Sequence, residues 1–297
     1  MHVGRSADGQ AVLHGVAVEQ MLDIGKTVLD TVAVADCRQR VETCLSGVQA
    51  RMDGLGSDPL VHSVVDLEGR GTVIRSQDSN LGNMLAGVVR EYYSVDIALV
   101  NSGGIRCDKV IASTLSECGG TIRQPLTVRD LIEIVPFEKS NHDQVDALEN
   151  SFSDAHMGGR FLQMSGLTVI ADWTRPEGNR VLEARHVTRS QDQQIRKNDE
   201  RKYTVAMPAF IADGFDGYAC FGNQETIVSE EGAITDTQLL LRTFGYGRKD
   251  ARAYHEQGVD EDAARFEKAR QVVVVRWDAG GLPMVAPQLD KRIVTDR

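Results

Sequence analysis

A pair of glycines and an arginine follow an apolar run near the first third of this chain. Residues 95–100 read Val-Asp-Ile-Ala-Leu-Val, and the next six read Asn101-Ser-Gly-Gly-Ile-Arg106. Glycine lets backbone N–H groups come close to a ligand, and the forked guanidinium of arginine suits an anion such as phosphate. The pattern predicts a buried strand that opens into an anion-binding loop. Strand-to-glycine turns are common, however, so other segments must support this interpretation.

Three further segments carry chemically useful residues. Arg70 and Arg75 lie ahead of the run Ser79-Asn-Leu-Gly-Asn83, and Val135-Pro-Phe137 closes a predicted helix. The third segment follows the strand-like run 203–207 and reads Pro208-Ala-Phe-Ile-Ala-Asp-Gly-Phe-Asp-Gly-Tyr218. Together they supply cations, aromatic rings and a carboxylate flanked by glycine.

In this order, the four segments resemble the C-terminal domain of the 5'-nucleotidase / UDP-sugar hydrolase family. The family has four short patterns in the same order along the chain. The first is an arginine followed by N-x-G-N, and the others are N-G-G-G-I-R, P-F-G-N and N-F-x-A-x-G-G-D-G-Y. The similarity covers most of residues 60–225, and the run 286–293 resembles the family segment P-x-x-D-G-R-I. The resemblance implies an α+β fold of the 5'-nucleotidase C-terminal type, with a mixed β-sheet and flanking helices.

The resemblance also implies a site for a nucleotide or nucleoside. Such a ligand presents a flat apolar base, two ribose hydroxyls and a charged phosphate, which call for aromatic planes, a carboxylate acceptor and forked cations. Two phenylalanines would stack on the base, the asparagine would contact its edge, the aspartate would accept from the ribose, and the arginines, joined by Arg70, would hold the phosphate. The implied substrate-binding residues are Arg75, Asn101, Gly103, Gly104, Arg106, Phe137, Phe210 and Asp216.

Each assignment has a structural alternative. Phenylalanine at a helix end or in a strand is more often a core residue than a ligand platform. Arg75 would ordinarily be a solvated strand end, and Asp216, which stands beside Gly217, would ordinarily form a turn.

Composition limits the classes of partner. The chain has 297 residues and a formal net charge of -10, which disfavours general binding to nucleic acid or to an anionic membrane. No apolar stretch approaches the roughly 18 residues that a membrane span needs. The amino terminus shows no signal peptide, whereas the family is often extracellular or periplasmic, so the localisation stays open. Five cysteines without C-x-x-C spacing predict free thiols.

The organisation can be predicted coarsely. We expect an amino-terminal segment with a linker-like helix in 1–58, the 5'-nucleotidase C-terminal-like domain in 59–250, and an extension of a helix and a strand in 251–297 that packs on the domain. Apolar spacing predicts helices over 41–55 and 81–92, the second capped by Ser79 or Asn80, and Thr127 with Asp130 predicts a capping box before a third. Charged, glutamine-rich residues predict an exposed loop over 185–202. The expected strands are 95–100, 161–171, 180–188, 203–207 and 271–277.

The chain departs from the family pattern in two places. After Phe137, the family continues with Gly-Asn and an apolar strand, whereas the run from Glu138 leads almost at once to residues 146–151, so about one strand is missing. Phe215 stands where the family has glycine. If that position needs a positive φ, phenylalanine there costs about 1 kcal/mol and tilts Asp216.

The metal ligands of the family's catalytic domain are not found ahead of this domain. That domain holds two divalent metal ions with patterns of the D-x-H, G-N-H-[DE] and G-H-x-H kind. We therefore predict that this chain contains no cofactor and no catalytic residue, is inactive alone, and is the nucleotide-recognition part of a phosphate-ester hydrolase. Its partners would be the substrate, a separate or missing metallophosphatase domain, or a second copy in a homodimer. The alternatives are a stand-alone nucleotide-binding module and a structural remnant that associates through helix 41–55.

Overall fold

The computed structural model divides the chain into two compact units, Met1–Arg51 and Met52–Arg297. The residues described are 2–5, 11–15, 39–47, 56–114, 124–135, 147–153, 158–188, 190–196, 201–221, 227, 234–246 and 260–296. In the first unit, β1 (His2–Arg5) and β2 (Ala11–Gly15) pair antiparallel, and residues 39–47 form a helix. The predicted helix over 41–55 is confirmed for 41–47, and its remainder lies outside the described residues.

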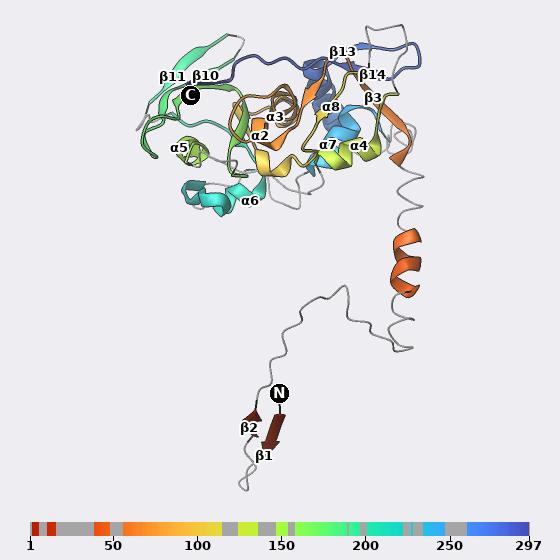
Figure 1. Ribbon diagram of the computed structural model, residues 1–297. Coiled ribbons are helices and arrows are strands. Elements are labelled where there is room, and N and C mark those ends of the chain that lie inside the picture. The colour runs from red at the N-terminus through yellow and green to blue at the C-terminus, as the bar shows by residue number, and fades with distance from the viewer. Residues whose placement is uncertain are drawn as a thin grey trace. The chain divides into compact units, whose positions relative to one another are not determined.

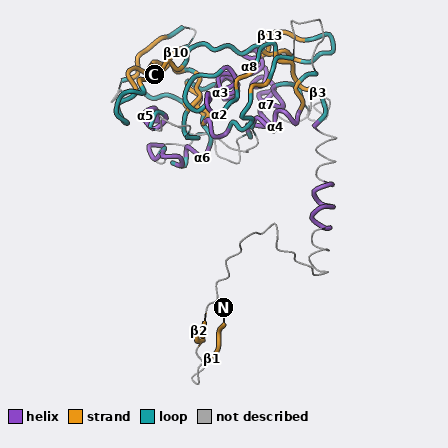
Figure 2. The backbone as a smooth tube through the Cα atoms, in the orientation of Figure 1, coloured by secondary structure: helices purple, strands orange, loops and turns teal. Residues whose placement is uncertain are grey.

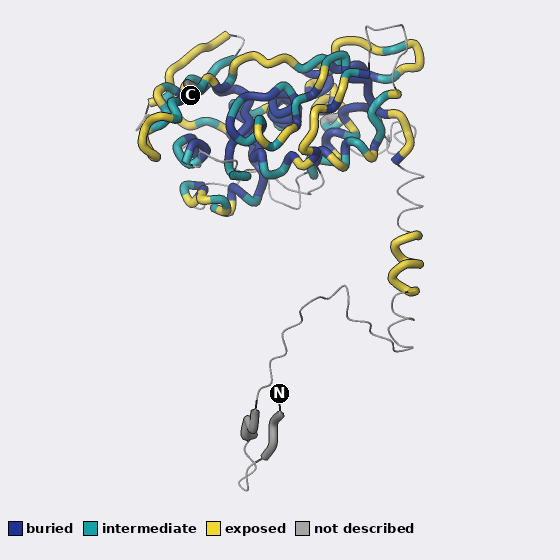
Figure 3. Tube along the Cα trace, in the orientation of Figure 1, coloured by how far each residue is buried: buried dark blue, intermediate teal, exposed yellow. Residues whose placement is uncertain are grey.

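The second unit is built around helix α3 (Asn80–Tyr93), most of whose residues are buried (Figures 1 and 3). The side chain of Ser79 accepts a hydrogen bond from the Gly82 N–H at 3.0 Å, which confirms the predicted cap. Helix α8 (Asp260–Val273) and strands β5 (Ile97–Asn101) and β8 (Leu162–Ser165) pack against α3. The amphipathic pattern therefore predicted the helix, and its small residues let neighbours approach on several sides.

Several small mixed sheets surround this helix, with helices interleaved between them (Figure 2). Strand β5 pairs in parallel with β12 (Val205–Ala206) and antiparallel with β8. The fold is α+β, as predicted. The remaining sheets have the orders β11-β10-β9-β15, β13-β14-β3-β7 and β4-β6. Their strands are β3 (Pro59–Ser63), β4 (Leu67–Glu68), β6 (Val110–Ile111), β7 (Leu126–Thr127), β9 (Leu167–Asp172), β10 (Val181–Val187), β11 (Asp192–Ile195), β13 (Val274–Trp277), β14 (Pro283–Val285) and β15 (Ile293–Asp296).

A single glycine divides the strand predicted over 161–171. Gly166 has a φ of 81° and ends β8, and β9 then joins a different sheet. A Cβ at this position would lie 2.1 Å from the Asp96 carbonyl oxygen, so only glycine fits. One apolar run thus contributes to two sheets.

Two other predicted segments also differ. Strand β10 confirms the strand predicted over 180–188. The loop predicted over 185–202 is wrong where β10 continues to Val187 and where residues 192–195 form β11, which pairs antiparallel with β10. The side chains of β11 are mostly polar and exposed, so no apolar alternation marks this strand. The strand predicted over 271–277 is shorter, since α8 continues to Val273 before β13 begins.

The remaining helices are short. Helix α4 (Val128–Ile134) begins at the predicted capping box, in which the Thr127 N–H donates to Asp130 Oδ2 at 2.7 Å. Two apolar clusters form the core, one centred on α3 and the other formed by residues of β8, β9, α5 and α6. The other helices are α2 (Gly71–Ile74), α5 (Ala147–Ser151), α6 (Ala209–Ala212), α7 (Asp236–Thr243) and the 3₁₀ turns η1 (Ser102–Gly104), η2 (Phe215–Gly217) and η3 (Ala219–Phe221).

Candidate functional site

The glycine turn, residues 101–106, follows the fully buried strand β5. Ser102 holds it in place, because its hydroxyl lies within hydrogen-bond distance of the carbonyl oxygens of both Ile74 and Phe161. The Ser102 N–H also donates to the Phe161 oxygen at 2.8 Å. The serine that replaces the family's glycine thus links the end of β5 to the end of α2 and to the residue that precedes β8.

A second glycine segment lies directly against this turn. The Gly103 N–H donates to the Gly159 carbonyl oxygen at 2.8 Å. A Cβ on Gly103 would lie 2.9 Å from the Gly159 Cα, and a Cβ on Gly159 would lie 3.1 Å from the Gly103 Cα. Two backbones therefore touch where a side chain on either glycine would force one of them to shift. The sequence prediction did not include Gly159, although the pair Gly158-Gly159 is visible in the sequence.

The carboxylate of Asp216 approaches the same place. Its Oδ2 lies 3.8 Å from the position that a Cβ on Gly159 would occupy. Asp216 belongs to the aspartate turn, residues 213–218, whose backbone is left-handed at Gly214, Asp216 and Gly217. The Asp216 carbonyl accepts from Asn150 Nδ2 at 2.9 Å. The structure thus brings Asp216 to the glycine turn through Gly159.

The expected strain at Phe215 does not occur. Phe215 keeps a negative φ, and the positive value of 54° falls on Asp216 instead. Aspartate tolerates the left-handed region better than phenylalanine does, because its short polar side chain can bond locally. The phenylalanine at the family's glycine position is therefore compatible with this turn.

Tyr218 is hydrogen-bonded to the segment that contains Gly159. Its buried hydroxyl donates to the carbonyl oxygen of Arg160, and burial raises the pKa of this phenol above its usual range. The aspartate turn and the Gly159 segment are consequently tied together by a hydrogen bond as well as by contact.

The predicted arginines lie in different surroundings. Arg75 is half-buried at the end of α2, one residue after the carbonyl that accepts from Ser102. Arg106 has an exposed side chain, and its N–H donates to the Ile134 oxygen at 2.9 Å. Arg70 is paired with Glu68, with 2.9 Å between Nε and Oε1. The salt bridge commits Arg70 to a partner within the chain.

Asn101 offers a buried acceptor at the base of the glycine turn. The residue is 2% exposed, and no group among the described residues donates to its Oδ1. Buried polar atoms are nearly always hydrogen-bonded, so an acceptor left open at a strand end is a candidate ligand contact. A Cβ on Gly104 would lie 3.5 Å from this oxygen.

Of the two predicted aromatic residues, one can be placed. Phe210 in α6 is half-buried and packs against the second core cluster, and its ring is stacked with that of Phe215. Phe137 lies outside the described residues, as does the shortened segment that follows it.

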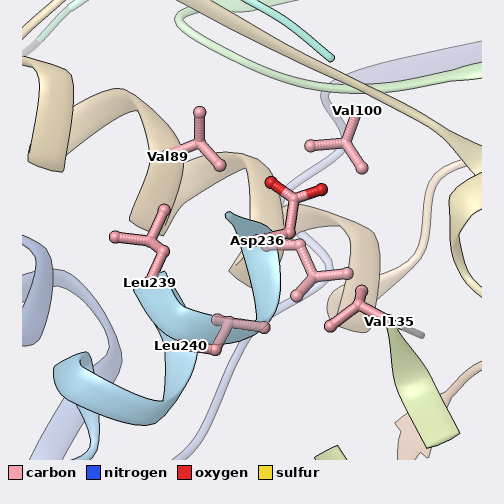
Figure 4. A pocket seen from close by; sticks show the side chains of 7 residues that line it. Val89, Val100, Val135, Asp236, Leu239 and Leu240 are labelled. Carbon is pink, nitrogen blue, oxygen red and sulfur yellow. The ribbon is translucent and has the colours of Figure 1, made fainter. Parts of the chain in front are cut away.

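A small cavity lies away from these residues, between α3, α7 and the end of β5 (Figure 4). Its volume is about 10 Å³, and it is lined by Leu85, Val89, Val100, Val135, Asp236, Leu239 and Leu240. This lining is apolar except for Asp236, and it includes none of the predicted site residues. A cavity of this size holds about one water molecule, so we assign no ligand to it.

A buried histidine lies between a hydroxyl and a carboxylate. His62 Nδ1 is 3.1 Å from Thr114 Oγ1, and its Nε2 is 3.4 Å from Asp278 Oδ2. Thr114 is 2% exposed, and its hydroxyl donates to the Ser63 oxygen at 3.1 Å. The hydroxyl is closed to substrate and already has an acceptor, so the cluster links β3 to the β13–β14 turn and is no nucleophile site.

The described part of the chain contains no group of three or more His, Cys, Asp or Glu side chains that could hold a metal ion. Inside the domain, the sequence does contain one D-x-H triplet, Asp154-Ala-His156, and Asn141-His-Asp143 matches three letters of G-N-H-[DE]. Both lie outside the described residues. Cys44, Cys107 and Cys220 are free thiols, as predicted.

Comparison with known proteins supports the resemblance. The model of the 5'-nucleotidase C-terminal domain matches residues 61–223, more than half of the chain. The chain belongs to the 5'-nucleotidase C-terminal domain family. The snake venom 5'-nucleotidase of Crotalus adamanteus is 26% identical over 205 residues, which cover 61% of this chain and 33% of that protein. The 5'-nucleotidase of Vibrio cholerae is 27% identical over 216 residues, with 72% and 34% covered.

A solved structure agrees on the fold of this 5'-nucleotidase C-terminal domain. The 5'-nucleotidase precursor of Thermus thermophilus matches with a TM-score of 0.60 and 24% identity, over 86% of this chain and 42% of that one. The chain thus spans about a third of the two curated relatives and less than half of the solved one. None of the helices in the described residues is long and apolar enough to cross a bilayer.

Proposed function

We propose that this 5'-nucleotidase C-terminal domain binds a nucleotide through its nucleoside part and positions it for phosphate-ester hydrolysis. The observation that carries the proposal is the convergence of Asp216 and the glycine turn at Gly159, next to the buried, unpaired acceptor oxygen of Asn101. A carboxylate suits the two ribose hydroxyls, and an amide oxygen suits an amino group on the base edge.

The phosphate would be held at the rim of this site. Arg106 leaves the glycine turn with an exposed side chain, and Arg75 ends α2 beside the Ser102 link. A guanidinium pairs with phosphate through two parallel hydrogen bonds, so this pair would compensate locally for the chain's net charge of -10.

Hydrolysis itself would come from the two divalent metal ions of the family's metallophosphatase domain. When bound, such ions polarise the phosphoryl oxygens and activate the attacking water. The residues of this domain would bind and orient the nucleoside and phosphate. We therefore expect the 297-residue chain to release no phosphate from AMP, UMP or UDP-glucose with Mg²⁺, Mn²⁺, Zn²⁺ or Co²⁺ added, and metal-dependent turnover in the monomer peak would contradict this.

Titration tests the binding proposal directly. Calorimetry or NMR with adenosine and AMP should show saturable binding between high micromolar and millimolar Kd, about −4 to −5 kcal/mol. Arg106→Ala should weaken the binding of AMP about tenfold and leave the binding of adenosine nearly unchanged, because only AMP carries the phosphate. Arg175→Ala removes an exposed arginine between β9 and β10 and serves as the control. Absence of saturable binding, or equal losses for both ligands in Arg106→Ala, would contradict the proposal.

A further inference from the structure

The ring of Phe215 covers a face of Phe210. The two ring centroids are 4.9 Å apart, and the ring planes differ by 12°. Offset-stacked aromatic rings in direct contact have this separation, so a third flat ring has no room between them. Phe210 also packs against the second core cluster.

The open aromatic face therefore belongs to Phe215. This side chain is 56% exposed, whereas Phe210 is half-buried. Gly214, with a φ of 91°, reverses the chain between the two rings, and the Phe215 carbonyl accepts from the Tyr218 N–H at 3.2 Å. The position of the ring is thus set by an ordered turn.

The next residue along the chain is the carboxylate of the candidate site. Asp216 leaves the same 3₁₀ turn and reaches Gly159, which contacts Gly103. An exposed flat apolar surface and a ribose-type acceptor therefore come from adjacent residues. A nucleoside has a flat heterocycle joined to a diol at this short range.

We propose that Phe215 provides the ring on which the heterocycle of the ligand stacks, and that Phe210 supports Phe215 from behind. This inference rests on the proposed function and assigns the base platform to a residue that stands where the family has glycine. Base stacking on an aromatic ring is sequence-tolerant, so the platform would accept purines and pyrimidines alike.

Three variants test this assignment in the full chain. Phe215→Leu keeps an apolar side chain and removes the aromatic face, and it should weaken adenosine and AMP about tenfold each. Phe210→Leu should weaken them less than about threefold, and Phe215→Tyr should bind as the wild type does. Trp277→Leu removes another exposed aromatic ring, from β13, and should change nothing. Ribose 5-phosphate, which has no base, should bind all four variants and the wild type equally.

An NMR signal should accompany these changes in affinity. Stacking on Phe215 should shift the adenine H2 and H8 resonances upfield in the wild type and not in Phe215→Leu. Adenosine binding by the wild type that Phe215→Leu leaves unchanged or tightens, or a larger loss in Phe210→Leu, would overturn the inference and leave the proposed function standing. A wild type that binds neither adenosine nor AMP would overturn the proposed function, and this inference with it.

Discussion

The two turns that form the candidate site are fixed in different ways. The glycine turn is held through its own Ser102, whose buried hydroxyl meets the carbonyl oxygens of Ile74 and Phe161 in distant segments, and Gln163 donates to the same Ile74 oxygen. The aspartate turn is held mainly by its own backbone, since Gly214, Asp216 and Gly217 all adopt left-handed conformations. Buried polar links are expensive to break, whereas backbone preferences are worth about 1 kcal/mol each. Substitutions in the glycine turn should therefore affect folding, and those in the aspartate turn should chiefly affect binding.

The largest loss of stability is expected when Gln163 is substituted. Its Nε2 donates to the Ile74 oxygen at 2.8 Å and to the Gln77 oxygen at 2.9 Å, and the residue is fully buried. Gln163→Leu leaves the Gln77 carbonyl without its donor and the Ser79 N–H without its acceptor, so it should lower the free energy of unfolding by about 4 kcal/mol. Urea unfolding measures this, with the exposed Gln194→Leu on β11 as control. A loss below about 1 kcal/mol would show that the loop before α3 is held by other contacts.

The next largest loss of stability is expected at Gly103, and the neighbouring Gly104 should tolerate the same substitution. A Cβ on Gly103 meets the backbone of Gly159 at 2.9 Å, so Gly103→Ala should cost about 3 kcal/mol and abolish nucleoside binding. Gly104→Ala is the matched control, because its nearest neighbour is the Asn101 Oδ1 at 3.5 Å, an ordinary contact. It should fold with a loss below about 1 kcal/mol. Equal stability of the two variants in urea unfolding would contradict the backbone contact.

A smaller, pH-dependent effect is expected at Asp78, which precedes α3. Burial raises its pKa from 3.8 to about 6, and its Oδ2 accepts from the Arg292 N–H at 3.0 Å. The folded state therefore binds a proton more tightly than the unfolded state. The resulting stabilisation is complete below pH 3.8 and is lost as the pH rises to about 6, with a limit of about 3 kcal/mol.

Comparison with the Asp78→Asn variant separates the pH-dependent contribution of Asp78 to stability from the contributions of other carboxyl groups. The stability of the wild type minus that of the variant should fall between about pH 4 and pH 6 and stay flat from about pH 7 to 8. Thermal unfolding across this range measures it. A difference that rises with pH would mean that the carboxylate is stabilised by its partners, against the expected direction.

The smallest effect is expected in the aspartate turn. Gly214 has a φ of 91°, but a Cβ there would meet only ordinary contacts, the nearest at 3.5 Å from the Ala219 Cα. Gly214→Ala should therefore cost about 1 kcal/mol, from the backbone conformation alone. Because the turn also positions Phe215 and Asp216, the variant should weaken the binding of adenosine more than its small loss of stability in urea unfolding suggests. A loss as large as that of Gly103→Ala would remove the distinction between the two turns.

Features that depend on neighbouring residues could be predicted from the sequence. The Ser79 cap and the Thr127–Asp130 capping box involve residues three positions apart, so the sequence shows both partners together. Helix α3 and strand β5 could be predicted from the spacing of apolar residues, because this spacing is also visible over a few neighbouring positions. The family resemblance identified the segments that carry the site, because its patterns are short and contiguous.

Only the tertiary structure could decide how these segments meet. Ser102 bonds to a carbonyl 59 residues away, and Gln163 to one 89 residues away, and no local pattern encodes either pairing. The division of 161–171 at Gly166 depends on the approach of Asp96, and the exposure of Phe215 depends on its stacking with Phe210. The sequence by itself determined the types of side chain and the local turns that present them. Their mutual distances were decided by the path of the chain through two cores, because packing fixes contacts between residues far apart in sequence.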